Sequence, residues 1–403
     1  DGRYDSNRGK KSNLTASPNN FNKINMVYSQ SDNFFTYRSI NPNRVNIDKF
    51  SNVVTWTKPK TYGELIDSWT NINIGNTLDL DGDKGEVRAL RRCKNELYAF
   101  QDKGICRILF NNRTQLSTTE GTPIELATSG TVDGKVYETT YGCINKWSIS
   151  PETPIGLYFI DDSLKSIVRF DGKWTNLSDT SGFHSYMKTH SNTLNIWNPS
   201  DFNTFVTYYD SINKDVFFIN NRDCLAYSET LQSFSSFYSY NHVPYMTNID
   251  NRFISVNPSR HLDSSTEYCI WNQNEGNYNV FYDKYEPYHV QLLATDTVVK
   301  DRIFNTVEIM ADGLQTSGAY IPDLMFDSIT VNNEYQSNTE TLQRLVSKPC
   351  NLQKKFRLWR INIPRDFNSM NRMRNPWLYV KLEKTMESFD KLVVHDFKIS
   401  YYE

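Results

Sequence analysis

Short apolar runs alternate with polar turns through the middle of the chain. In "LYFIDDSLKSIVRFDGKWTNLS" (157–178), residues 157–160 form a continuous apolar run that is typical of a strand buried on both faces. Residues 161–163 offer side-chain oxygens that cap a tight turn, and a second apolar run follows them. Asp171-Gly172 then breaks that run, because glycine supplies the positive φ that a hairpin turn requires. The pattern predicts a meander of three strands joined by two turns.

The same order of elements recurs three more times along the chain. It is found in "NELYAFQDKGICRILF" (95–110), "KDVFFINNRDCLAYSETLQSFSSF" (214–237) and "NRFISVNPSRHLDSSTEYCIWNQNEGNYNVF" (251–281). Repeated antiparallel meanders are typical of β-propeller blades, which need roughly 40 to 50 residues each. We therefore predict a β-propeller-like domain over residues 85–285, with a large sandwich of hairpins as the alternative.

The pattern changes at about residue 286, where the predicted strands become longer. Five of them are expected, at 289–296, 301–312, 354–364, 376–384 and 391–402. In the fourth, Leu378, Val380 and Leu382 alternate with Tyr379 and Lys381, as in a half-buried antiparallel strand. We predict an antiparallel β-sandwich domain over residues 286–403. The fold class is therefore all-β.

Residues 1–84 form a polar N-terminal arm and connecting segment. Basic residues outnumber acidic ones, 10 to 4, over residues 1–60, and apolar periodicity is weak over residues 1–57, so residues 1–57 cannot bury enough apolar surface to fold alone. It is expected either to lie on a neighbouring subunit or, for residues 25–57, to add a flanking strand to the propeller. Two short helices are predicted, at 58–69 with a capping box and at 339–348.

Composition narrows the class of protein. The 403 residues include 25 Tyr and 23 Phe, which suit half-buried pleated faces, and the net charge of −2 gives no global attraction to nucleic acid or membrane. Six scattered cysteines without CxxC spacing are expected to be reduced, as in a protein that folds in a cytosol. No apolar run reaches the roughly 20 residues of a membrane span, and no signal peptide is recognisable. Asp1 in place of Met fits a trimmed or processed chain.

Catalytic signatures are missing from the sequence. It contains no G-x-S-x-G, H-E-x-x-H, Walker A or G-x-G-x-x-G motif. Asp161 and Asp162 could be proposed as a glycosidase pair, but adjacent residues at a strand–turn junction point apart and are better interpreted as turn caps. His184 and His190 lack ligand partners at a suitable spacing. We therefore expect no enzymatic activity and no cofactor.

One acidic cluster resembles a metal site. Asp79, Asp81 and Asp83 match positions 1, 3 and 5 of a calcium loop. Position 6 is Lys84 instead of Gly and position 12 is Leu90 instead of Glu, which excludes an EF-hand. An irregular Ca²⁺ site remains an alternative to the simpler interpretation, a solvated acidic turn.

The stretch 354–377 is basic and contains aromatic residues. Its Lys and Arg side chains could bind phosphates, but the preferred interpretation is an Arg-rich loop that binds carboxylates of a neighbouring subunit. The residues assigned to this subunit interface are Arg372, Arg374, Asn375 and Trp377.

Five segments together resemble a known family. They are "LYAFQDKGICRI", "LYFIDDSLKSIVRFDGKW", "KFRLWRINIPRD", "RMRNPWLYVKLEK" and "VVHDFKISYYE", within residues 85–403, and they are similar to the tail stabilisation, or muzzle, proteins of crAss-like short-tailed phages. The resemblance implies a non-enzymatic virion protein in the distal tail nozzle, assembled in the bacterial host cytoplasm as a homo-oligomeric ring. It further implies contacts with ring, tube or fibre proteins of the tail, and transient contact with genomic DNA in the channel. A glycan-binding or glycan-cleaving receptor-recognition propeller is the alternative.

Overall fold

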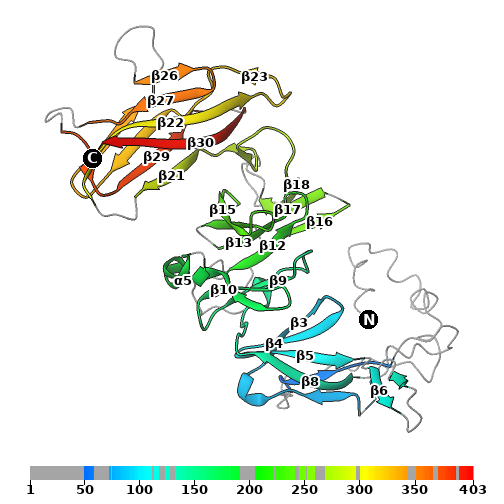
Figure 1. Cartoon of the computed structure of the whole chain (residues 1–403). Coiled ribbons are helices and arrows are strands. Elements are labelled where there is room, and N and C mark those ends of the chain that lie inside the picture. The colour runs from blue at the N-terminus through cyan, green and yellow to red at the C-terminus, as the bar shows by residue number, and fades with distance from the viewer. Residues whose placement is uncertain are drawn as a thin grey trace, which may run out of the picture. The chain divides into compact units, whose positions relative to one another are not determined.

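The computed structural model describes residues 50–402 in several stretches (Figure 1). Its gaps are 59–71, 74, 111–112, 118–122, 128–131, 181, 191–204, 221–222, 241–244, 251, 259–267, 296–299, 344–350, 366–370 and 387–389. The predicted N-terminal arm to residue 49 and nearly all of the predicted helix at 58–69 lie outside the described residues. The chain divides into two compact units, one of residues 1–209, 214–221 and 226–235, the other of residues 210–213, 222–225 and 236–403. The predicted domain boundaries at 84/85 and 285/286 stay predictions.

Antiparallel meanders follow one another along the first part of the chain. The first sheet has the order β3-β4-β5-β8, formed by Val87–Cys93, Glu96–Gln101, Gly104–Phe110 and Val132–Thr139. Two small pairs accompany it: β1 with β2 (Val53–Thr55, Thr77–Asp79) and β6 with β7 (Arg113–Ser117, Pro123–Ala127). The second sheet has the order β11-β10-β9, formed by Trp174–Asn176, Ser166–Phe170 and Leu157–Asp161.

Two more meanders and a small hairpin complete this series. The four-stranded sheet β12-β13-β14-β15 is formed by Val206–Asp210, Asp215–Ile219, Cys224–Ser228 and Ser233–Tyr238. The sheet β16-β17-β18 is formed by Tyr245–Ile249, Arg252–Pro258 and Tyr268–Asn272, and the hairpin β19-β20 by Val280–Phe281 and Lys284–Tyr285. The described helices are short: η4 (Gly82–Lys84), η5 (Lys146–Ser148), α4 (Leu177–Thr180) and α5 (His184–His190).

An aspartate that ends the first strand caps the turn in two successive meanders. The Asp161 carboxylate accepts bonds of 2.9 Å from the backbone N–H groups of Ser163 and Leu164, and Lys165 closes the turn with φ of 53°. Asp210 repeats the arrangement 49 residues later, and Lys214 closes its turn with φ of 60°. The predicted capping role of Asp161 is confirmed. These caps make β12 the structural equivalent of β9, whereas the apolar pattern of the sequence aligns β9 with β13.

The interval of 49 residues lies within the range of propeller blades. The all-β prediction is confirmed, because antiparallel sheets make up nearly all the regular structure of the described residues. Closure of these sheets into a propeller remains a prediction.

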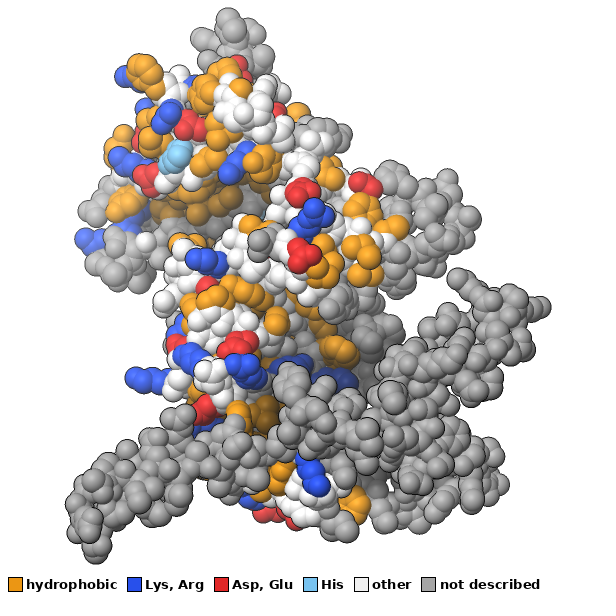
Figure 2. Space-filling model, turned by 90° about the vertical axis from the view of Figure 1, so that its right-hand side faces the viewer, with side chains coloured by type: hydrophobic (Ala, Val, Ile, Leu, Met, Phe, Trp, Pro, Cys, Tyr) orange, Lys and Arg blue, Asp and Glu red, His pale blue; other side chains and the backbone are white. Residues whose placement is uncertain are grey.

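Two antiparallel sheets enclose one hydrophobic core in the C-terminal part. One has the order β21-β29-β24-β25, formed by Tyr288–Ala294, Leu378–Lys384, Ser328–Asn332 and Ser337–Thr341. The other is built on the long strand β22 (Arg302–Leu314), with β23 (Tyr320–Ile321), β26 (Leu352–Lys355), β27 (Leu358–Asn362), β28 (Arg374–Asn375) and β30 (Lys391–Tyr402). Buried residues of both sheets, such as Ile309 and Trp359 on one and Val331 and Val380 on the other, form the core. On the outside, hydrophobic and basic side chains lie among one another in the upper part of Figure 2.

Two predicted elements of this part differ from the structure over their described residues. The predicted helix at 339–348 begins in a strand, since β25 extends to Thr341, and residues 344–350 lie outside the described part. Hydroxyl groups of Thr330 and Thr339 meet at 2.9 Å across β24 and β25, which favours pairing over helix. The strand predicted at 354–364 is a hairpin, because the chain turns at Phe356 and Arg357 between β26 and β27.

Candidate functional site

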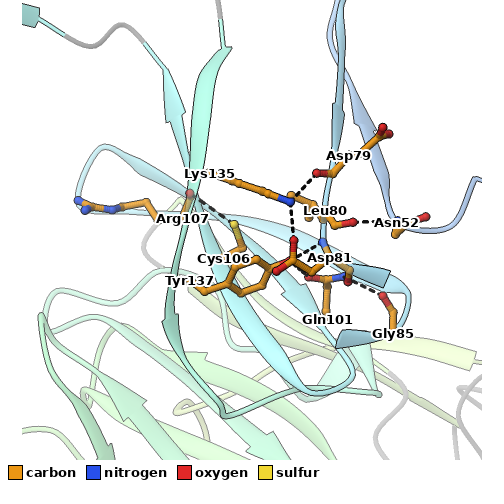
Figure 3. Close-up of polar contacts among 10 residues, drawn as sticks. All are labelled: Asn52, Asp79, Leu80, Asp81, Gly85, Gln101, Cys106, Arg107, Lys135 and Tyr137. Carbon is orange, nitrogen blue, oxygen red and sulfur yellow. Dashed lines mark hydrogen bonds and ion pairs between the residues drawn. The ribbon is translucent and has the colours of Figure 1, made fainter. Parts of the chain in front are cut away.

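The acidic turn that resembled a calcium loop is held by protein groups (Figure 3). The Lys135 ammonium, from β8, lies 2.6 Å from the Asp81 carboxylate and donates to the Asp79 backbone oxygen at 2.8 Å. Asp79 and Asp83 are exposed. In the described part of the chain, no three His, Cys, Asp or Glu side chains converge as metal ligands would.

A buried glutamine completes this turn. The Gln101 amide donates to the backbone oxygens of Asp81 (3.1 Å) and Gly85 (2.7 Å) and accepts a bond of 2.6 Å from the Tyr137 hydroxyl. That hydroxyl accepts in turn from the Asp81 backbone N–H at 2.8 Å, and burial raises the pKa of Tyr137. The acidic turn at Asp81 is therefore bound to β4 and β8 by hydrogen bonds that stiffen the first sheet. Gln101 and Tyr137 carried no recognisable signal in the sequence, because their partners are distant along the chain.

Asp161 and Asp162 bind different backbone segments. The second oxygen of Asp161 accepts a 2.9 Å bond from the Gly142 N–H, and Asp162 accepts a 3.3 Å bond from the Asn145 N–H. Burial is the main cause that raises the pKa of both groups, for Asp162 to about 6. Asp161 thus caps its turn as predicted, whereas Asp162, predicted as a second turn cap, accepts instead from Asn145, 17 residues earlier.

A buried glutamate links two segments that the sequence did not connect. Glu229, 5% exposed, accepts hydrogen bonds from the Thr153 hydroxyl and, at 3.1 Å, from the Tyr158 hydroxyl. The Tyr158 and Tyr227 rings lie with centroids 5.6 Å apart, and Arg169 donates to the Tyr227 hydroxyl at 3.2 Å. Burial, followed by the charge of Glu229, raises the pKa of Tyr158. These contacts tie the sheet β9–β11 to the chain around β14.

The predicted interface residues lie on and beside a short strand instead of a free loop. Arg374 and Asn375 form β28, which pairs with Ile303 and Arg302 of β22. Asn375 is buried and its side-chain oxygen accepts from the Trp377 N–H at 3.2 Å, while Trp377 itself is half-buried. Buried Met373 and Asn375 are therefore the anchors of this segment.

The two predicted arginines point outward from that segment. The Arg374 side chain is 66% exposed, with its guanidinium 3.5 Å from Asp301 of the same chain. Arg372 is exposed, and its backbone oxygen accepts from Gln336 at 3.3 Å. The structure brings all four predicted residues together at one end of β22, and their role in a subunit contact remains a prediction.

Several other bases of the stretch 354–377 pair within the chain. Lys354 lies over the Trp359 ring at 4.7 Å, Arg357 lies 3.2 Å from Asp312, and Arg360 lies 4.0 Å from Glu308.

The described cysteines at positions 93, 106, 143, 224 and 269 are free thiols, as predicted, and Cys350 lies outside the described residues. Within the described stretches, no helix is both long and apolar enough to span a membrane.

Comparison with known proteins now gives the family. Residues 1–259 match the family model of the crassvirus muzzle protein, and residues 276–366 match the model of the crassvirus muzzle protein C-terminal domain. The chain is also 44% identical, over 404 aligned positions, to the muzzle protein of Bacteroides phage crAss001. That alignment covers 100% of this chain and 29% of the relative, so the chain spans less than a third of the relative's length. The chain therefore belongs to the crassvirus muzzle protein family.

Proposed function

We propose that this chain is a non-enzymatic part of the phage tail nozzle, where several copies form a ring that stabilises the tail and guides or closes the DNA channel. Membership of the muzzle family supports a bacteriophage structural protein of the virion. Because the chain spans 29% of its relative, the nozzle position, the ring and the contacts with other tail proteins and DNA belong to the proposal.

The observation that supports a structural role is that buried and turn carboxylates bind donor groups of the same chain. Asp81 binds Lys135, Asp161 caps its own turn and binds Gly142, and Glu229 binds two hydroxyl groups. A general acid or base needs a side chain within reach of a substrate proton, whereas these oxygens are occupied by donors of the fold. Sheets cross-linked in this way suit a structural component of the virion.

Position in the virion tests the proposal directly. Gold-labelled antibodies raised against this chain should mark the distal end of the tail in electron micrographs of intact particles. Label on the capsid would contradict the nozzle assignment. So would mass spectrometry that detects none of this chain in purified virions. The purified chain should release no reducing sugar from host capsule; release that is lost in Asp161→Asn or Asp162→Asn would favour the glycan-cleaving alternative.

The interface part of the proposal has its own test. The double change Arg372→Ala with Arg374→Ala should lower incorporation into tails, because truncation of a desolvated interfacial arginine costs on the order of 2 kcal/mol or more per contact. The stability of the free chain should stay within about 1 kcal/mol of wild type, since the Arg374–Asp301 pair is exposed. Exposed Arg92, changed to Ala, is the matched control. Wild-type incorporation of the double variant would remove both arginines from the interface, and loss of DNA retention with intact tails would indicate phosphate contact.

A further inference from the structure

A large apolar residue occupies a turn position that disfavours it. Phe356 and Arg357 form the two-residue turn of the hairpin β26–β27, where Lys355 pairs with Leu358. Phe356 has φ of 56° and is 86% exposed. Glycine, asparagine and aspartate are the residues that adopt this conformation at low cost in such turns, and a bulky side chain is strained there.

The strain at Phe356 is not offset by burial in this fold. Most of the described non-glycine residues with positive φ are polar, and two of them, Tyr282 and Phe356, carry aromatic rings. Tyr282 is 5% exposed and so gains burial for its ring, whereas the ring of Phe356 projects into solvent. A strained backbone conformation at a residue whose side chain makes no compensating contact within the chain indicates that the side chain binds another molecule.

The hairpin that presents Phe356 is rigid. The Lys354 ammonium lies over the Trp359 ring at 4.7 Å and donates to the Tyr320 hydroxyl at 3.3 Å. The backbone oxygen of Arg357 accepts a 3.1 Å bond from the Ala311 N–H, which fastens the turn to β22. A side chain held in one place loses little entropy when it enters a partner.

Exposed apolar neighbours extend the surface around this ring. Leu358 and Met310 are exposed and lie opposite each other on β27 and β22. We call Phe356, Leu358 and Met310 the Phe356 patch.

The rim of the Phe356 patch offers positive charge. The side chains of Arg357 and Arg360 are 62% and 53% exposed, whereas their carboxylate neighbours Asp312 and Glu308 are 11% and 22% exposed. The acids thus lie beneath the bases and orient them, and the cationic groups face outward. Exposed Asp396, opposite Met310 on β30, marks the limit of this basic rim.

We propose that the Phe356 patch docks into an apolar pocket, rimmed by aspartate or glutamate, on a virion protein other than a second copy of this chain. An aromatic side chain beside exposed arginines has the composition of an interface centre, and guanidinium groups pair bidentately with carboxylates. The identity of the partner as a virion protein rests on the proposed function, while the docking surface rests on the geometry of the hairpin.

Site-specific photo-crosslinking identifies the occupant. The photoreactive amino acid p-benzoylphenylalanine replaces Phe356 in the full-length protein of the phage, and in a control it replaces Leu231, which is 68% exposed in the turn between β14 and β15. Irradiated virions should yield a crosslink from position 356 to a different virion protein, in a segment where apolar residues are flanked by Asp or Glu. A crosslink to a second copy of this chain, or crosslinking no stronger than at position 231, would overturn the proposal.

A matched pair of substitutions separates docking from folding. Phe356→Asn places a residue that tolerates positive φ in the turn, so the melting temperature should stay level or rise by about 2 °C. Incorporation into virions should fall at least about tenfold, which corresponds to loss of one interface anchor. The control Leu231→Asn should incorporate as wild type.

Three outcomes would overturn or redirect this inference. A lower melting temperature for Phe356→Asn would show that the ring supports the fold, and unchanged incorporation would show that it docks nowhere; either outcome overturns the docking surface. Absence of the wild-type chain from purified virions would instead contradict the proposed function and with it the virion partner.

Discussion

Removal of the Asp327 carboxylate should destabilise the C-terminal sandwich more than any exposed ion-pair change. One oxygen of Asp327 accepts from the Lys384 ammonium at 2.6 Å, and the other accepts from the backbone N–H groups of Thr385 (2.9 Å) and Met386 (2.7 Å). The Asp327 and Lys384 side chains are both 10% exposed. The change Asp327→Ala therefore leaves a buried ammonium and two backbone donors without their acceptor.

The magnitude follows from burial. Breaking a buried pair by removal of one partner costs about 3–5 kcal/mol, since the remaining charge is desolvated and unpaired. Lys384→Met should cost less, because two backbone N–H groups still bind the carboxylate. The pair Lys381–Glu383 is the control: its N–O distance is also 2.6 Å, but both side chains are 28% exposed. Glu383→Ala should cost no more than about 1 kcal/mol.

Hydrogen exchange measured by mass spectrometry reports the loss of stability of the C-terminal sandwich separately from the rest of the chain. Peptides from β24 and β29 of the full chain report the opening free energy of the sandwich, independently of the other sheets. Protection in these peptides should fall most in Asp327→Ala, less in Lys384→Met and least in Glu383→Ala. Equal loss of protection in Asp327→Ala and Glu383→Ala would refute the reasoning that burial sets the cost.

Two further predictions concern the first unit. The pKa of Asp162 is raised by burial to about 6, so the folded state keeps a proton between about pH 4 and 6 that the unfolded state releases, and stability falls as pH rises through this window. The fall in the free energy of unfolding is at most about 3 kcal/mol, and Asp162→Asn should remove it. Urea denaturation of the wild type and of Asp162→Asn at pH 4.5 and 7 measures it. An equal change with pH in the two proteins would exclude the effect. A methyl group at Gly156 would lie 1.8 Å from the Phe170 backbone oxygen, so Gly156→Ala should cost about 1–3 kcal/mol or more in urea unfolding. The control Gly75→Ala meets no atom within 4 Å, and an equal cost there would contradict the steric argument.

The sequence by itself determined features that depend on neighbours along the chain. The alternation in 378–384 predicted β29, whose residues alternate between buried and half-buried positions, because side chains of a strand point to opposite faces. The cap of Asp161 was equally predictable, since its carboxylate bonds N–H groups two and three residues ahead. Acidic residues at the spacing of a calcium loop, in contrast, left an irregular Ca²⁺ site open beside a solvated turn, and the sequence did not show that Lys135, 54 residues away, binds Asp81.

Tertiary structure alone decided which local preferences prevailed. Over residues 339–341, where the predicted helix at 339–348 begins, β25 pairs with β24 instead, because cross-strand contacts outweigh weak helix propensity. The apolar pattern of 354–364 gave no sign of a turn at Phe356, since that residue contradicts the turn chemistry from which hairpins are recognised. The bonds of Glu229 to Thr153 and Tyr158 join residues 76 and 71 positions apart. Local periodicity carries no information on such contacts, because the fold of the intervening chain sets which distant side chains meet.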